Sequence, residues 1–472
     1  MLKLKLIIPD MRKFFMSGIK TENTSCGMDM TSGSLWKKIV LFSIPLMMSQ
    51  VLEVLFNMSD VAVVGKFASY EALGAVGSTT ILVTLFTGFL IGMGCGVNVI
   101  VARQLGARQH KDLKDTIQTA FILCLIVGII VSIICISCAH LLLNLLNTKE
   151  ELIDGAMLYF RIYALGMPAM AVYNFGNAVM SAGGDTKRPL LYLFIAGIVN
   201  VCLNLIFVIG FRLAEQGVAM ASIISQYISA TLIMTNLLRR NDVCKLRLLQ
   251  VRINKNAAKA ILMLGIPAGI QSTVINISNA LLQSSVNSFG SIAMAGYTAA
   301  NNIFGFLYVS VNAVTQSCMS FTSQNYGVRK TKRMDKVLMD CIVLSVAVSF
   351  TLGCGAYFFG DKLLRLYTSD PDVIQCGIEI LAYTTVPYFC CGIMDLIPGA
   401  LRGMGRSGVP MILSIIGTVG TRIVWIFGLF PHHRSLSFLF ISYPVSWIIT
   451  IILQVICYYF VRKKVHKTIL GM

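Results

Sequence analysis

The sequence predicts an all-α polytopic membrane protein with twelve transmembrane helices in two six-helix lobes, related by a pseudo-two-fold axis along the membrane normal. Only 13% of the 472 residues are charged, whereas about one quarter of a soluble globular chain is charged. Uncharged runs such as 116–139 and 435–460 reach the roughly 20 residues that a helix needs to cross a bilayer. These runs lack two-residue alternation, which excludes a membrane β-barrel.

Hydropathy predicts six spans in each half of the chain. The first six are 39–65, 73–101, 116–140, 154–181, 189–211 and 216–238, and the second six are 258–288, 294–324, 337–360, 375–401, 408–430 and 436–460. The domains expected from them are a basic amino-terminal tail (1–36), a first lobe (37–238), a linker (239–257), a second lobe (258–461) and a carboxy-terminal tail (462–472).

The basic residues predict the orientation. With the amino terminus in the cytoplasm, 31 of the 39 Lys and Arg residues fall on cytoplasmic segments and six fall in outer loops. Positive charge gathers on the cytoplasmic side of membrane proteins, so we expect both termini there, in the cell membrane, with no cleavable signal. Topology and anionic lipid account for the net charge of +18, and no nucleic-acid partner is needed to explain it.

The two halves repeat each other. FASYEALG (67–74) matches FGSIAMAG (289–296) at an offset of 222, and residues 44–45 match 266–267 at the same offset. ARQLGAR (102–108) matches SQNYGVR (323–329), and 178–189 matches 399–410, both at an offset of 221. Six helices return the chain to the same side, so the repeats are parallel and predict a transporter that rocks around a central cleft. The chain has no HExxH motif and no evident catalytic set, so we do not expect an enzyme.

Three acids lie deep in predicted helices: Glu53, Asp60 and Asp395. An ionised acid at that depth is costly unless it is paired, hydrated or coordinating, and it indicates a functional site. Asn200 and Asn204 share a face of the fifth helix. With Asp60 they predict an oxygen cage for a small hard cation, or a proton carrier if Asp60 is protonated. Hydrogen bonding between helices is the alternative for the Asn pair.

The chain resembles the multidrug and toxic compound extrusion (MATE) transporters from residue 35 onward. The resemblance is carried by LFNMSDVAVVGKF in the first helix, RQLGARQ, AGGDTKRPL, NVCLN in the fifth helix, GVAMASIISQ, and GALRGMGRSGVP. It implies export of organic cations against Na⁺ or H⁺, with no other cofactor. It also implies a cation site at Asp60, Asn200 and Asn204, with Ser222 at the position where a hydroxyl is usual in the sixth helix.

Some positions depart from the family pattern. Asn204 stands where some members have a second Asp, which favours Na⁺ slightly, and the seventh helix carries Gln283 and other amides but no acid. Glu53 stands where Gln is expected, either as a cavity charge or as a neutral, hydrogen-bonded side chain. Together with Asp395 and Gln283 it forms the predicted substrate cavity. Pro45 predicts either a fixed kink or a hinge in the first helix.

We therefore expect a monomer in the lipid bilayer whose partners are small organic cations or drugs. Two alternatives stay open. A flippase for lipid-linked oligosaccharides would need a cationic cavity, whereas the deep charges here are mainly acidic, with only Arg161 and Arg422 against them. A receptor or channel that does not perform coupled transport would need no coupling ion.

Overall fold

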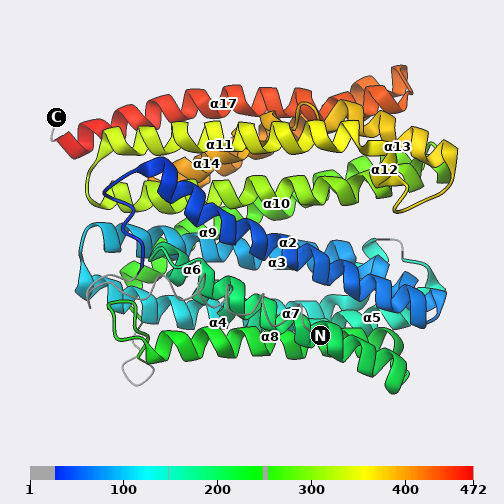
Figure 1. The fold of residues 1–472 in the computed structure, drawn as a ribbon, viewed down its shortest axis with the longest axis horizontal. Coiled ribbons are helices and arrows are strands. Elements are labelled where there is room, and N and C mark those ends of the chain that lie inside the picture. Colours follow the sequence, from blue (N-terminus) through cyan, green and yellow to red (C-terminus); the bar gives the residue numbers. More distant parts are fainter. Residues whose placement is uncertain (1–26, 147, 248–252, 471–472) are drawn as a thin grey trace, which may run out of the picture.

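The first half of the chain forms six membrane-crossing units. The computed structural model describes residues 27–146, 148–247 and 253–470, which form helices and no strand (Figure 1). The first six units are α2 (Leu35–Phe67), α3 (Tyr70–Gly106), α4 (His110–Leu145), α5 (Glu150–Ala164) with α6 (Met167–Ala182), α7 (Lys187–Leu205) with the π-helix η1 (Ile206–Gly210), and α8 (Ala214–Arg239). Most of the predicted amino-terminal tail and part of the linker lie outside the described residues.

The second half repeats this order. Its units are α9 (Lys255–Asn287), α10 (Ser291–Gly327), α11 (Thr331–Phe358) followed by the short α12 (Gly360–Leu364), α13 (Pro371–Thr384) with α14 (Tyr388–Gly403), an irregular span and α17 (Leu436–Leu470). The irregular span comprises α15 (Gly408–Ser414), the π-helix η3 (Ile415–Gly420), α16 (Thr421–Val424), the π-helix η4 (Trp425–Leu429) and the 3₁₀ turn η5 (Phe430–His432). Most of the second half lies above most of the first in Figure 1.

Eleven of the twelve units are apolar enough to cross a membrane. Among the described residues, nine single helices and two bent pairs pass a test of length and hydropathy. The twelfth unit, α10, carries polar side chains such as Asn312, Gln316 and Ser320, and most of its length is buried in protein. A helix surrounded by other helices needs no apolar surface for lipid, so its low hydropathy is explained by its central position.

Two predicted spans each consist of two helices that meet at a bend. Within the span predicted over 154–181, α5 and α6 meet at 43°, and within the span predicted over 375–401, α13 and α14 meet at 49°. Pro168 lies in the first turn of α6, and Pro387 directly precedes α14. Proline has no N–H to donate and its ring clashes with the carbonyl four residues back, so each proline interrupts the helix.

The repeat is visible in the backbone as well as in the sequence. Arg108 and Arg329, which follow α3 and α10, are left-handed with φ of 55° and 60°. Gly184 and Gly405, which follow α6 and α14, have φ of 89° and 82°. Each pair is separated by 221 positions, the offset of the sequence repeat. Corresponding helices therefore end with the same backbone turn, as parallel repeats should.

The lobes meet at one end of the bundle. We call it the basic end; it carries the connections 107–109, 183–186, 328–330 and 404–407, and lies at the left in Figure 1. In this half, α3 packs against α9 backbone to backbone: a Cβ added at Gly92 would lie 2.4 Å from the Cα of Gly269, and one added at Gly96 would lie 2.8 Å from the N of Gly265. Small residues allow membrane helices to approach this closely.

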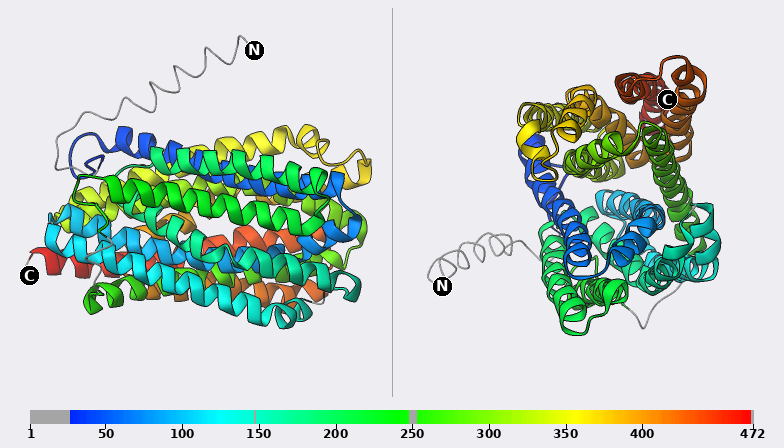
Figure 2. Two further views of the ribbon diagram at one scale, coloured as in Figure 1. Left: turned by 90° about the horizontal axis from the view of Figure 1, so that it is seen from below. Right: turned by 90° about the vertical axis from the view of Figure 1, so that its right-hand side faces the viewer.

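Hydrogen bonds reinforce the contact between the lobes in the same half. Ser43 of α2 contacts Ser317 of α10 at 2.8 Å, and Ser320 donates to the side-chain oxygen of Asn98 at 2.9 Å. Nearer the basic end, the Gln324 amide donates to the carbonyl oxygen of Ala182 at 2.7 Å. The structure is therefore closed between the lobes at its basic end, and Figure 2 shows the helices along and across the bundle.

Residues 27–34, the amino-terminal strap, cross the two lobes at the basic end. The backbone of Met30 donates to Gln324 at 3.2 Å, and the side chain of Asn325 donates to the Met30 carbonyl oxygen at 3.1 Å. Arg333 donates to the carbonyl oxygen of Ser32 at 2.7 Å. At the other edge, Gly27 packs against the backbone of 183–185 in the first lobe, where a Cβ would lie 2.5 Å from the nearest oxygen.

Asp29 fixes the shape of the strap. Burial raises the pKa of its carboxyl, but hydrogen bonds from Ser32 and Thr31 and the charge of Lys38 outweigh this and hold the pKa at about 2. Lys38 also donates to the Asp29 carbonyl oxygen at 2.5 Å. The carboxylate is therefore charged at neutral pH and closes a turn that aims the strap at α10.

Candidate functional site

A glycine positions the predicted site in the first lobe. The ring of Phe56 in α2 lies directly on Gly197 of α7, where a Cβ would be only 1.8 Å from the nearest ring atoms. One turn further along each helix, Asp60 follows Phe56 and Asn200 follows Gly197. The close approach of α2 to α7 thus brings the acid of one helix to the amides of the other.

The four predicted residues form one hydrogen-bonded cluster. Asn204 donates to Asp60 Oδ1 at 2.5 Å, and the Ser222 hydroxyl from α8 donates to Asp60 Oδ2 at 3.0 Å. Asn204 also donates to the Asn200 Oδ1 atom at 3.3 Å. All four are buried, and Asn204 is 0% exposed. The structure brings them together from three helices; their role in ion binding stays a prediction.

The cluster has no cationic partner of its own. Among the described residues, no Lys, Arg or His forms a salt bridge with Asp60. The side-chain oxygen of Asn204 is buried without a hydrogen-bond partner. No three His, Cys, Asp or Glu side chains gather as a metal site in the described part of the chain. Carboxylate, amide and hydroxyl oxygens are ligands that suit a hard cation, and a carboxylate alone can hold a proton.

The three residues predicted to line a substrate cavity lie apart from this cluster. Glu53 is half-buried on α2, two turns before Asp60, within electrostatic range of Tyr163 and Tyr173. Asp395 is half-buried on α14, within range of Arg402. Gln283 is half-buried on α9. The structure places them on three helices of two lobes, and their contact with substrate stays a prediction.

Pro45 lies within one continuous helix. α2 runs from Leu35 to Phe67 through this buried proline, and the Ser49 hydroxyl donates to the Pro45 carbonyl oxygen at 2.9 Å. The backbone group that Pro45 frees is the carbonyl oxygen of Leu41, four residues earlier, and membrane helices tolerate such an interruption. The hinge remains a prediction about a second conformation.

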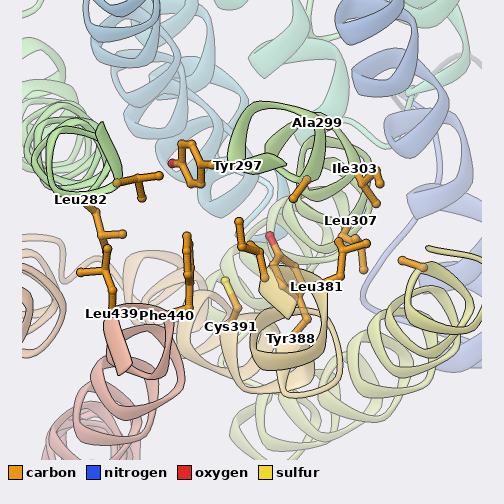
Figure 3. Close-up of a cluster of buried hydrophobic side chains, with 14 of the residues drawn as sticks. Leu282, Tyr297, Ala299, Ile303, Leu307, Leu381, Tyr388, Cys391, Leu439 and Phe440 are labelled. Carbon is orange, nitrogen blue, oxygen red and sulfur yellow. The ribbon is translucent and has the colours of Figure 1, made fainter. Parts of the chain in front are cut away.

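A second charged cluster, in the other lobe, was not predicted as a site. Arg422 of α16 is 3% exposed, and its Nη1 donates to the Asn279 side-chain oxygen of α9 at 2.7 Å. Its guanidinium lies 4.3 Å from the ring centroid of Tyr443 of α17. The arginine was visible in the sequence as a deep charge, but its partners come from two other helices and only the fold shows them. Figure 3 shows buried hydrophobic side chains of the same lobe, among them Tyr297, Tyr388 and Phe440.

Two lobes of membrane-crossing helices, with a buried acid that forms no salt bridge among the described residues, are typical of a multi-pass membrane transporter. The comparisons with known proteins give the family: the MatE family model matches twice, over residues 45–206 and 267–427, one match in each lobe. The chain belongs to the MATE family of multidrug efflux transporters, whose members are transporters and not enzymes. The predicted family and the two-lobed twelve-helix fold are confirmed.

Relatives and solved structures agree with this assignment. The probable multidrug resistance protein YoeA of Bacillus subtilis is 26% identical over 92% of this chain and 96% of its own. The probable multidrug resistance protein NorM of Thermotoga maritima is 24% identical over 82% and 84%. A MOP superfamily transporter from Pyrococcus furiosus, titled as having a binding pocket of reverse polarity, matches at TM-score 0.86 and 22% identity, over 94% of this chain and 99% of its own. A MATE transporter described in an outward-facing conformation matches at TM-score 0.85 and 21% identity, over 96% and 100%.

Proposed function

We propose that this protein exports organic cations by antiport with Na⁺ or H⁺, through alternating access of a site between its lobes. The observation that carries the proposal is the buried Asp60 cluster, in which a carboxylate receives hydrogen bonds from Asn204 and Ser222 and forms no salt bridge with any residue that the structure describes. A buried acid without a cationic partner is stable when it binds a transported ion or a proton, and costly when it does not. Such a site is suited to coupling.

The ion and the substrate are linked through the charge of the first lobe. A bound Na⁺ or proton neutralises Asp60 and lowers the affinity of the lobe for a cationic substrate. By linkage, a bound cationic substrate lowers the affinity for the ion to the same extent. Na⁺ would take the oxygens of Asp60, Asn200, Asn204 and Ser222, and the unpaired Asn204 oxygen would gain a partner when its amide turns toward the ion.

Alternating access requires the basic end to open. The contacts between α3 and α9 and between the strap and α10 hold the lobes together there, so the structure corresponds to one end state of the cycle. The other state needs these contacts broken and the lobes joined at the opposite end. We place the basic end in the cytoplasm of a cell-membrane protein because 31 of 39 basic residues sort to that side.

The charges of the interior favour cations as substrates. Glu53 and Asp395 are half-buried acids, one in each lobe, and aromatic rings such as that of Tyr173 near Glu53 attract cations. A flat lipophilic cation could be attracted by the acids and also stack on the aromatic rings.

Reconstituted vesicles test the proposal. Purified protein in liposomes is given ethidium and an imposed Na⁺ or pH gradient, with equal ion concentrations on both sides as the control. We expect gradient-driven movement of dye with at least one of the two ions. Equal dye flux with and without both gradients would favour a channel, and no ethidium flux alongside movement of a lipid-linked sugar would favour a flippase.

A further inference from the structure

Arg422 is a buried charge that the coupling cycle described above does not use. It lies in the four-residue α16, between the π-helices η3 and η4. π-helical turns are uncommon and occur frequently at functional sites. The arginine is 3% exposed and belongs to a span of 25 residues that is long and apolar enough to cross a membrane. An ionisable residue inside a membrane span is by default a candidate functional group.

The guanidinium of Arg422 is incompletely satisfied. One nitrogen donates to Asn279 at 2.7 Å and the plane lies over the Tyr443 ring, but Nε is buried without a hydrogen-bond partner. No Asp or Glu of the described residues forms a salt bridge with this arginine. A guanidinium presents five donors in a plane suited to a carboxylate. The site thus has a positive charge and an unpaired Nε donor for an anionic partner.

The Arg422 cluster and the Asp60 cluster are built from corresponding spans of the two lobes. At an offset of 221, Ser222 of the Asp60 cluster corresponds to Tyr443, and at 222, Asn57 of α2 corresponds to Asn279. Both clusters join the first, fifth and sixth span of their lobe, and each contains a π-helix in its fifth span. The two lobes therefore carry charges of opposite sign in clusters built from corresponding spans, although Arg422 itself aligns with Val201 and Asp60 with Leu282.

The Arg422 cluster reaches the face that α9 turns toward the first lobe. Ser272 and Asn276 lie within 2.7 and 3.5 Å of the position that a Cβ on Gly88 of α3 would take. Asn279 follows Asn276 by three residues on the same face of the helix, and it is half-exposed. A ligand between the lobes would therefore meet Asn279 first, and the buried guanidinium lies directly behind it, hydrogen-bonded to its side-chain oxygen.

The surroundings of Arg422 are aromatic. Tyr297 stacks on Phe440 at 5.8 Å between ring centroids, and Phe440 stacks on Tyr443 at 6.0 Å. Tyr388 lies within electrostatic range of the arginine. In Figure 3 the side chains of Tyr297, Phe440 and Tyr388 gather between α10, α14 and α17. Rings with hydroxyl groups beside a guanidinium suit an anionic group attached to an aromatic body.

We propose that Arg422 and Asn279 form a subsite for the carboxylate of a zwitterionic aromatic substrate, whose cationic group is attracted to the acids of the interior. The inference rests on the proposed function, because it names a substrate class for the same transporter. The shared chemistry is an anionic group, and a free inorganic anion could supply it as well as a carboxylate on the substrate. Binding measurements separate these sources and do not require transport.

The test uses a matched pair of dyes with purified full-length protein in detergent. Rhodamine 110 carries a free carboxylate, and rhodamine 123 is its methyl ester, so the two differ only in that charge. Dissociation constants are measured by fluorescence anisotropy for the wild type, Arg422→Gln, Arg422→Lys and Asn279→Ala. The control is Arg161→Gln, because Arg161 is an exposed arginine within a span of the other lobe, where it donates to the carbonyl oxygen of Ile136.

We expect Arg422→Gln to weaken binding of the acid dye by about tenfold or more, the range of a charge-assisted hydrogen bond, and that of the ester by less than about twofold. Asn279→Ala should also weaken binding of the acid dye more than that of the ester. Arg422→Lys should retain part of the preference for the acid dye, and Arg161→Gln should change the affinity for neither dye. If Arg422→Gln does not fold, the dye affinities of Asn279→Ala and Arg422→Lys provide the test instead.

Four results would overturn the proposal. The first is a wild type that binds the ester as well as the acid, or binds neither. The second is an equal loss of affinity for both dyes in the Arg422 variants, which indicates a structural role. The third is chloride or phosphate competing with the acid dye no more in the wild type than in Arg422→Gln. The fourth is competition by these anions for both dyes alike, which would assign the site to a free inorganic anion and not to the substrate. Failure of the proposed antiport would appear in vesicles and leave this dye preference unchanged.

Discussion

Gly92 allows the most direct test of the closed contact at the basic end. A Cβ at this position would lie 2.3 Å from the N and 2.4 Å from the Cα of Gly269, and 2.8 Å from the carbonyl carbon of Ala268. All three are backbone atoms, so no side chain can move aside. Non-bonded carbon atoms are ordinarily at least about 3.5 Å apart. Gly92→Ala therefore requires α3 and α9 to separate by about 1 Å.

The energetic effect follows from this overlap. Forcing a methyl group into a packed contact costs about 1–3 kcal/mol, which shifts an equilibrium between two states by roughly 5- to 150-fold. Because the overlap exists only where the lobes touch, the cost falls on the state that is closed at the basic end. The matched control is Gly77→Ala on the same helix, where an added Cβ meets nothing within 4 Å.

Spin labels measure the result. Labels are attached to cysteines introduced at Gln109 and Lys332, exposed positions at the basic end of the two lobes, in a background in which the native cysteines have been replaced. Pulsed dipolar spectroscopy should show a longer distance or a new long component in Gly92→Ala, and the parental distribution in Gly77→Ala. Identical distributions in both variants would refute the argument that this glycine contact determines closure.

Three further predictions follow from the charges. Asp29→Asn should increase the rate of amide hydrogen exchange in the strap at pH 7. In the wild type, the stability that the ionised Asp29 gives to the strap should be present above pH 4 and be lost as the pH falls through about 2. Equal exchange rates in both proteins would contradict this. Asp395→Asn should reduce export of cationic compounds more than of neutral ones, and an equal loss would indicate a structural acid. In intact cells, cysteines at Lys149 and Arg434 should react with an impermeant maleimide and one at Lys332 should not, while labelling at Lys332 would contradict the orientation.

The architecture could be predicted from the sequence because hydropathy and internal repeats are patterns of the linear chain. Long uncharged runs located the spans, and the offsets of 221 and 222 located the repeats. The bends near Pro168 and Pro387 were missed because proline is often tolerated within membrane helices, and its effect depends on the neighbours that satisfy the freed carbonyl. Pro45 illustrates the difference, since α2 continues through it.

The candidate sites divide in the same way. The residues of the Asp60 cluster could be selected because an acid and two amides are conspicuous among apolar neighbours, and the family pattern added Ser222. The Arg422 cluster could not be assembled from the sequence, because Asn279 and Tyr443 lie on other helices and are ordinary residues there. The role of the inter-lobe glycines could not be predicted from the sequence either, because a glycine indicates a close approach between helices only when the neighbouring helix is known.

The measurement that tests the central claim most directly is gradient-driven transport by Asp60→Asn. The substitution keeps the shape of the side chain and removes its charge, so the neighbouring Asn204 and Ser222 can still form hydrogen bonds. In vesicles loaded with ethidium, we expect the rate of transport driven by Na⁺ or pH gradients to fall by about tenfold or more in the variant. This is the effect expected when the charged group that links ion binding to substrate binding is removed. It should insert, elute as the wild type does and retain dye binding. Normal transport under both gradients would show that Asp60 is structural and would contradict the coupling mechanism.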